Sequence, residues 1–181
     1  MKEARALTRD IEVTAIPYGD RMSLAAGETI YVTQALGGSF TGMTERGYMV
    51  RVEGKDADAI GEEAPVVPTL EDLKGRSVED LVWDQLKSCY DPEIPVNIVE
   101  LGLVYECTVE PLEDAEGGHR VRVAFTLTAP GCGMGDYLRQ DVYEKVMSVP
   151  TVREAEVEVV FTPPWSSAMM SDAARLQLGL M

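Results

Sequence analysis

The fold is decided by one stretch in which a strand, a loop and a helix follow one another, Val121-Arg122-Val123-Ala124-Phe125-Thr126-Leu127-Thr128-Ala129-Pro130-Gly131-Cys132-Gly133-Met134-Gly135. Apolar residues alternate with polar or small ones as far as Thr128, which is the period of a half-buried β-strand. From Met134 onward the apolar residues recur at helical spacing instead. The loop between the two patterns therefore places Cys132 close to the N-terminus of the predicted helix.

Cys132 is the residue of this loop with the most distinctive chemistry. The first turn of a helix presents unpaired N–H groups and the positive end of the helix dipole, and both stabilise a thiolate. We therefore expect the pKa of Cys132 to lie below that of an ordinary cysteine, and the thiolate is the form that attacks electrophiles and binds metals. The alternative interpretation is a small residue packed beside a glycine turn. Gly131 and Gly133 favour a functional cysteine, because glycine lets a ligand approach the backbone closely.

The elements around this stretch follow the order α-β-β-α-β. A helix is expected to begin after Ser77, which forms a capping-box pattern with Asp80, and to end at Asp91-Pro92. The further patterns predict strands at 103–110, 121–128 and around 157–161, a helix over 134–146, and a short helix from about Ser171 to Leu178. The first two strands form a hairpin, and the helix after them is a crossover, so the third strand should run parallel to the second. The predicted fold class is α+β, a small mixed sheet whose helices cover one face.

The chain is expected to contain two domains joined by a linker. Residues 1–60 carry β-branched runs separated by glycine turns, which predicts a small β-rich N-terminal domain with a sandwich or barrel-like arrangement. Residues 61–76 begin with two prolines and two acids without periodicity, as a linker does. Residues 77–181 form the second domain, which contains the Cys132 loop.

The composition of the chain restricts the classes of partner and the cellular compartment that we expect. The 181 residues carry a formal net charge of −15, so a phosphate backbone is repelled and nucleic acid is not an expected partner. The sequence has no run that could span a bilayer and no signal-peptide core, so we expect a cytoplasmic protein without membrane contact. The three cysteines are widely spaced and do not form a disulfide framework.

The remaining cysteines and the histidine are weaker candidates for chemistry. Cys89 falls on the apolar stripe of the first helix and Cys107 on the apolar face of the first strand of the hairpin, so both are expected in the core. The sequence has a single histidine, His119, and this excludes a three-histidine metal site. His119 lies in a turn-like segment, so Cys132 is left without an evident general base.

A rigid acidic loop after the first helix has two interpretations. Asp91 precedes Pro92 there, and Glu93 lies between Pro92 and Pro95. The two carboxylates are either capping acids at a helix stop, or one of them faces Cys132 as proton acceptor, hydrogen-bond anchor or oxygen ligand. Asn97 and Thr128 are either turn stabilisers or members of the same site. Trp165 follows two prolines and is either a core residue or an anchor for a partner.

Three separated motifs resemble the metal–sulfur cluster biosynthesis family, which is PaaD-like and includes the SufT-like proteins. The motifs are Asp91-Pro92-Glu93-Ile94-Pro95-Val96-Asn97-Ile98-Val99-Glu100-Leu101-Gly102-Leu103-Val104-Tyr105, then Thr128-Ala129-Pro130-Gly131-Cys132, and then Phe161-Thr162-Pro163-Pro164-Trp165. The resemblance covers about residues 77–181, and the β-rich front resembles the extra domain of the SufT-like members. It implies a role in iron–sulfur protein maturation, with Asp91, Glu93, Thr128 and Cys132 as functional positions. Many relatives have proline where this chain has Gly133.

The resulting hypothesis is an auxiliary maturation factor, not an enzyme, that helps deliver iron–sulfur clusters to recipient proteins. Cys132 would be a transient ligand of a cluster or iron, or a reactive contact, and iron–sulfur assembly proteins and recipient apo-proteins would be the partners. A cluster takes about four protein ligands, so a monomer is not expected to hold one stably, and a homodimer or a partner would complete the site. The alternatives are a thiol enzyme with Cys132 as nucleophile, or a non-catalytic adaptor for maturation partners.

Overall fold

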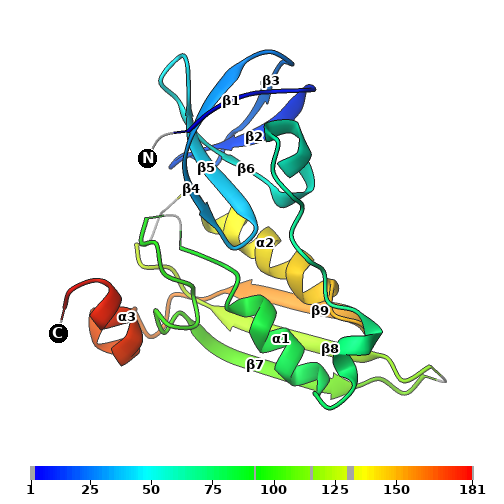
Figure 1. Cartoon of the computed structure of the whole chain (residues 1–181). Helices are drawn as coiled ribbons and strands as arrows, with labels where there is room; N and C mark the ends of the chain where they lie inside the picture. The colour runs from blue at the N-terminus through cyan, green and yellow to red at the C-terminus, as the bar shows by residue number, and fades with distance from the viewer. Residues whose placement is uncertain (1–2, 92, 115, 130–132, 181) are drawn as a thin grey trace. The chain divides into compact units, whose positions relative to one another are not determined.

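The computed structural model describes residues 3–91, 93–114, 116–129 and 133–180. The chain divides into two compact units, Met1–Val66 and Val67–Met181 (Figure 1). Within the described residues, none of the helices is long and apolar enough to cross a membrane.

The first unit is built on one antiparallel sheet. Among its described residues six strands pair in the order β1-β4-β5-β6-β2-β3. The strands are β1 (Glu3–Ala6), β2 (Ile11–Ala15), β3 (Arg21–Leu24), β4 (Thr29–Leu36), β5 (Ser39–Thr44) and β6 (Met49–Val52). A 3₁₀-helix, η1 (Gly54–Ile60), packs its apolar residues into the same core as Ile30 and Val50. The β-branched runs correspond to β2, β4 and β6, whereas β1 and β3 are sheet edges, where the apolar signal of a buried strand is weakest.

The second unit is a mixed α+β fold, as the sequence predicted. Its described elements are η2 (Leu70–Leu73), α1 (Val78–Leu86), β7 (Val104–Pro111), β8 (His119–Phe125), α2 (Gly135–Met147), β9 (Val152–Val159), η3 (Ser167–Met169) and α3 (Asp172–Gln177). β7 pairs antiparallel with β8, and β8 pairs parallel with β9, so α2 is the crossover that the order of elements required.

One face of the three-stranded sheet carries the core of this unit. Figure 1 shows α1 and α2 along the same side of the sheet. The side chains that fill the space between them are almost completely buried: Leu81, Val82, Leu86, Val121, Val123, Phe125, Leu138, Val142 and Val146. Alternate residues of β8 point into this core, and the intervening residues therefore lie on the opposite, outer face of the sheet.

Three elements of the second unit have other boundaries than the sequence predicted. β8 spans His119–Phe125 rather than 121–128, because its pairing with β7 and β9 ends at Phe125. α1 begins at the expected capping box, in which Ser77 and Asp80 bond each other's backbone N–H, but it ends at Leu86 rather than at Asp91. The helix stops early because the residues after it pair with the following loop, where the Ile98 N–H donates to the Cys89 carbonyl at 2.9 Å. β9 begins at Val152 and ends before Phe161, because its pairing with β8 begins near His119.

A C-terminal segment is held against the residues that lead into β7. The Tyr105 hydroxyl donates to the Pro163 carbonyl at 2.7 Å, and the Trp165 indole N–H donates to the Leu101 carbonyl at 2.7 Å. Gly102 has a φ of 76°, and a Cβ on it would overlap the carbonyl oxygen of Met169. Glycine is required there both by the left-handed backbone and by this close approach.

Replacing Gly102 should therefore destabilise the second unit more than a left-handed backbone alone explains. Gly117 is a matched control, because its φ is 70° and a Cβ on it would meet nothing within 4 Å. We expect Gly117→Ala to lower the free energy of unfolding by about 1 kcal/mol and Gly102→Ala by at least about 2 kcal/mol.

Urea unfolding followed by tryptophan fluorescence measures this difference, since both tryptophans, Trp83 and Trp165, belong to the second unit. Equal losses for the two variants would show that the contact with Met169 contributes nothing.

Candidate functional site

The candidate site lies at one edge of the three-stranded sheet, where three separate segments meet. β8 and β9 are parallel and end at this edge, and the antiparallel β7 begins there. Backbone hydrogen bonds join the segments: Thr126 N–H donates to Leu103 O at 2.9 Å, and Val160 N–H donates to Phe125 O at 2.8 Å. The described parts of the three motifs are therefore brought together, although up to about 60 residues separate them along the chain.

The Asp91 carboxylate connects two of these segments. Its side chain is buried, with the residue only 4% exposed. Oδ1 accepts the backbone N–H groups of Glu93 and Ile94, each at 2.9 Å, and Oδ2 accepts the hydroxyl of Thr128 at 3.2 Å. Of the roles that the sequence left open, this arrangement favours the hydrogen-bond anchor, because both oxygens are engaged in positioning loops.

The neighbouring polar residues play different parts. Glu93 is exposed and meets Asp91 through its backbone N–H. Asn97 stabilises a turn, since its Oδ1 accepts the backbone N–H groups of Val99 and Glu100 at 3.0 Å. Asp91 and Thr128 are thus brought together by their side chains, whereas the Glu93 carboxylate is turned towards solvent.

Cys132 lies outside the described residues, together with Pro130 and Gly131. The described flanks are Thr128-Ala129, which follow β8, and Met134, which is buried and is the N-cap residue of α2. Because Asp91 holds Thr128, it fixes one side of the entry to the segment that contains Cys132.

The other two cysteines are held in the core, as their positions in the sequence predicted. Cys89 is completely buried, and its thiol donates to the Gln85 carbonyl at 3.5 Å. Cys107 is half-buried against the same core. Burial raises the pKa of the Cys107 thiol to about 11, and the negative charge of Glu79 acts in the same direction. Cys107 is therefore protonated near neutral pH, and Cys89 is enclosed by the core.

His119 does not lie in a turn, contrary to the expectation from the sequence. It is the first residue of β8, because the hairpin closes between β7 and β8 one step earlier than the glycines suggested. Its Nδ1 lies 2.9 Å from the Thr151 hydroxyl oxygen. The strand rise places it about 20 Å from the edge that carries Thr128, so it is not positioned to serve that edge as a base.

Trp165 is a component of the core rather than an exposed anchor. It is half-buried against the apolar cluster under the helices, and its indole N–H bonds Leu101. The sequence did not reveal Glu100, whose carboxylate accepts the hydroxyl of Ser171 at the start of α3. The N-cap serine of a short C-terminal helix was the signal that could have pointed to such a contact.

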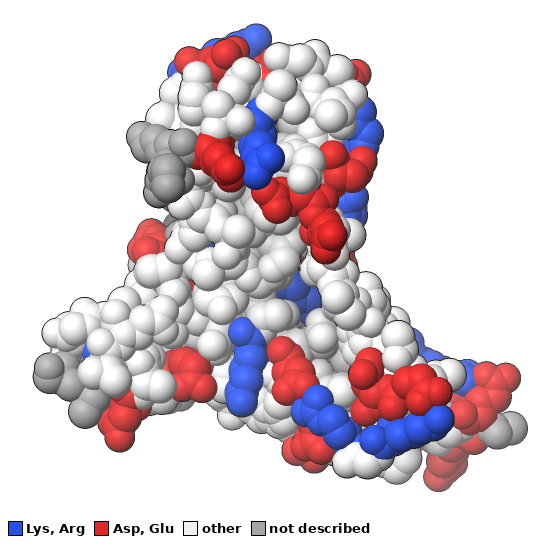
Figure 2. All heavy atoms as spheres, in the orientation of Figure 1, with Lys and Arg blue, Asp and Glu red and all other residues white. Residues whose placement is uncertain are grey.

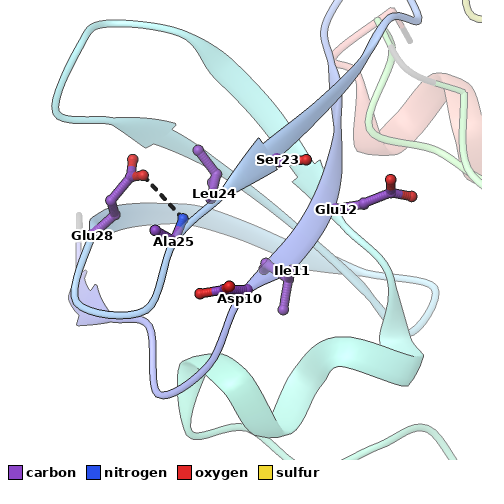
Figure 3. Close-up of a pocket in the computed structure, with 7 residues that line it drawn as sticks. All are labelled: Asp10, Ile11, Glu12, Ser23, Leu24, Ala25 and Glu28. Carbon is purple, nitrogen blue, oxygen red and sulfur yellow. Dashed lines mark hydrogen bonds between the residues drawn. The ribbon is translucent and has the colours of Figure 1, made fainter.

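A shallow depression in the first unit offers a different set of groups. It has a volume of about 340 Å³ and is lined by Asp10, Ile11, Glu12, Ser23, Leu24, Ala25 and Glu28 (Figure 3). The Glu28 carboxylate accepts the Ala25 N–H at 3.0 Å, and Asp10 accepts the N–H of Ala26 at 2.8 Å. These two acids therefore stabilise the turn after β3.

The described surface does not provide a preformed metal site. Among the residues that the structure describes, no group of three or more His, Cys, Asp or Glu side chains is arranged to hold a metal ion. Figure 2 shows acidic and basic side chains interspersed on the visible face. Any metal held near the edge would therefore need ligands beyond these residues.

Asp91 and Thr128 should stabilise the fold together, so that the effect of replacing one depends on whether the other is present. We expect Asp91→Ala to lower the free energy of unfolding by about 2 kcal/mol, because two backbone N–H groups lose their acceptor. Asp91→Asn keeps an acceptor oxygen and should lose less, and Thr128→Val should lose about 1 kcal/mol.

A double-mutant cycle with urea unfolding measures the coupling between Asp91→Ala and Thr128→Val. Additive losses would mean that the two side chains do not interact in solution.

The three thiols should differ sharply in reactivity. Near neutral pH we expect iodoacetamide to modify Cys132 in the folded protein while Cys89 and Cys107 react only after unfolding. Reaction at Cys107 should increase with pH towards about 11, because its raised pKa keeps it protonated below that value. Peptide mass spectrometry over time measures each site, with Cys132→Ser as control. Fast modification of Cys107 at neutral pH would contradict the assignment.

Comparison with known proteins places the second unit in a family. Residues 79–159 match the model of the iron–sulfur cluster assembly protein family. An iron–sulfur protein maturation auxiliary factor from Porphyromonas gingivalis is 44% identical over 103 residues, which cover 57% of this chain and 91% of that protein. The maturation auxiliary factor SufT from Staphylococcus aureus is 40% identical over 50% of this chain and 96% of its own length. A solved domain of unknown function from Bacillus anthracis is 39% identical, covers 58% of this chain and 94% of its own, and has a TM-score of 0.49. Because the two maturation factors are 44% and 40% identical to this chain over 91% and 96% of their own lengths, the chain belongs to the iron–sulfur cluster assembly protein family.

Proposed function

We propose that the protein is an auxiliary factor in iron–sulfur protein maturation that helps deliver clusters to recipient proteins. The observation that carries the proposal is the identity of 44% with a maturation auxiliary factor over nearly all of that relative's length. The contacts between the described parts of the three motifs support it, because Thr128 bonds Asp91 and Trp165 bonds Leu101 at one sheet edge.

Cys132 is the proposed point of contact with the cluster. Cys89 is buried, and the pKa of Cys107 is raised to about 11, so Cys132 is the remaining cysteine of the chain. Asp91 and Thr128 position the chain that leads to it, and Glu93 offers an exposed carboxylate nearby in the sequence. The thiolate of Cys132 can bind iron as one ligand of a cluster in transit.

The number of ligands that an iron–sulfur cluster needs indicates which partners this protein requires. A cluster takes about four protein ligands, and this chain supplies one suitable cysteine. The remaining ligands come from an assembly protein, a recipient apo-protein, a small thiol or a second copy of the chain. Binding is then transient, since no monomer completes the coordination alone.

A thiol enzyme is less well supported. His119 lies at the opposite end of β8, and both oxygens of Asp91 are engaged in hydrogen bonds. Neither of these two residues is therefore available as a general base. We propose a factor without catalytic turnover, working with its partners in the cytoplasm.

Anaerobic reconstitution with iron and sulfide tests the role of Cys132. We expect the wild-type protein to develop the visible absorption of a cluster, with the mass of a dimer or of a complex with an added small thiol. Cys132→Ala should abolish the absorption, whereas Cys107→Ser, a matched loss of a thiol, should retain it.

Identical featureless spectra for the wild type and Cys132→Ala would refute cluster binding and favour the adaptor role. A cluster that persists in Cys132→Ala but is lost in Cys107→Ser would show that Cys107, and not Cys132, is the ligand, which would overturn the proposal.

A further inference from the structure

The outer face of the three-stranded sheet carries charged residues in regular rows. Each row crosses β7, β8 and β9 in register, and the side chains of one row lie on the same face. The first row is Glu110, Arg120 and Glu154, the second is Thr108, Arg122 and Glu156, and the third is Glu106, Ala124 and Glu158. The helices α1 and α2 cover the other face, so this one is open (Figure 1).

In each of the first two rows, the arginine of β8 forms an ion pair with the glutamate of β9. Arg120 bonds Glu154 at 2.7 Å, and Arg122 bonds Glu156 at 3.0 Å. In each row the central strand supplies an arginine beside a glutamate of β9. These ion pairs are exposed, so they set the charge pattern of the face more than its stability.

The third row lacks its central cation. Ala124 stands where the other rows have arginine, and an exposed glutamate flanks it on each side. Within the described part of the chain, no ion pair is formed by Glu106 or Glu158, in contrast to Glu154 and Glu156. Strands lie about 4.8 Å apart, so the two flanking backbones are about 10 Å apart with only a methyl group between them.

We propose that this face docks a basic segment of a partner protein, with an arginine or lysine side chain lying over Ala124 between Glu106 and Glu158. A guanidinium carries five N–H donors in a plane and can bridge two carboxylates that a methyl group separates. We call this position, over Ala124 and between Glu106 and Glu158, the slot. Arg122 lies beside it in the neighbouring row, and the charge of Arg122 is already paired with Glu156. The incoming cation repeats the pattern of the other two rows.

Charge complementarity selects this occupant over others. The face holds five glutamates, Glu106, Glu110, Glu154, Glu156 and Glu158, against the two arginines Arg120 and Arg122, so it attracts cations and repels nucleic acid. Among the described residues, no group of three or more His, Cys, Asp or Glu side chains is arranged to hold a metal ion, so this face is not a preformed metal site.

The slot is also close to the candidate site. Ala124 is four residues from Thr128 along the chain, at most about 13 Å. A partner held there by its cation would lie beside the edge where the three motifs meet. The inference concerns partner binding and does not depend on cluster binding by Cys132.

Titration of the full chain with a synthetic tetra-arginine peptide, followed by amide NMR shifts, tests the slot. We expect the largest shifts at Glu106, Ala124 and Glu158. The double variant Glu106→Gln/Glu158→Gln should bind at least about fivefold more weakly. The double variant Glu63→Gln/Glu113→Gln removes the same charge from exposed positions outside this face and should bind as the wild type does.

Ala124→Arg provides a second, independent test, with Ala124→Gln as its uncharged control. The new arginine should occupy the slot, raise the melting temperature of the second unit and weaken peptide binding at least about fivefold, whereas the glutamine should do so much less. Native amide spectra of each variant establish that it is folded.

Several outcomes overturn the proposal. Equal losses in the two glutamine double variants would mean that the peptide senses only net charge. Shifts centred elsewhere, or unchanged binding by Ala124→Arg, would remove the slot from the interaction. The same shifts with magnesium or calcium ions, or on self-association in sedimentation, would assign the face to a metal ion or to a second copy.

Discussion

The central strand β8 pairs with β7 in the antiparallel sense and with β9 in the parallel sense, and this pairing determines where the rest of the second unit lies. Opposite directions on the two sides require β7 to begin, and β8 and β9 to end, at the same edge. The described segments that belong to the three motifs are therefore neighbours at that edge. The apolar side of the same strand, from Val121 to Phe125, supplies the surface on which the helices pack.

At that edge a buried carboxylate holds loops together in addition to the apolar packing of residues such as Ile98 and Leu101. Asp91 accepts three hydrogen bonds, two from its own loop and one from Thr128, and a buried carboxylate persists only when its oxygens are satisfied in this way. The C-terminal segment adds a second restraint through Trp165 and Leu101. Together these hydrogen bonds join the described parts of the three family motifs to one another. Cys132 itself lies outside the described residues.

The sequence allowed much of this fold to be predicted because its periodic patterns are local. The alternation along β8, the apolar stripe of α2 and the Ser77 capping box were recognisable, and the crossover rule then gave the parallel strand. The end of α1 and the position of His119 were not recognisable. Both depend on pairing with distant residues, Ile98 in one case and the β7 strand in the other, and that pairing leaves no local signal.

The sequence by itself determined the order of elements, the acidic character and the family, because those follow from patterns and motifs within short windows. The family resemblance read from three motifs is confirmed by the match over residues 79–159. Only the tertiary structure decided that Asp91 is an anchor for Thr128, that Trp165 belongs to the core, and that the third charged row has alanine at its centre. Those features depend on strand register and burial, which arise from contacts between residues far apart in the chain.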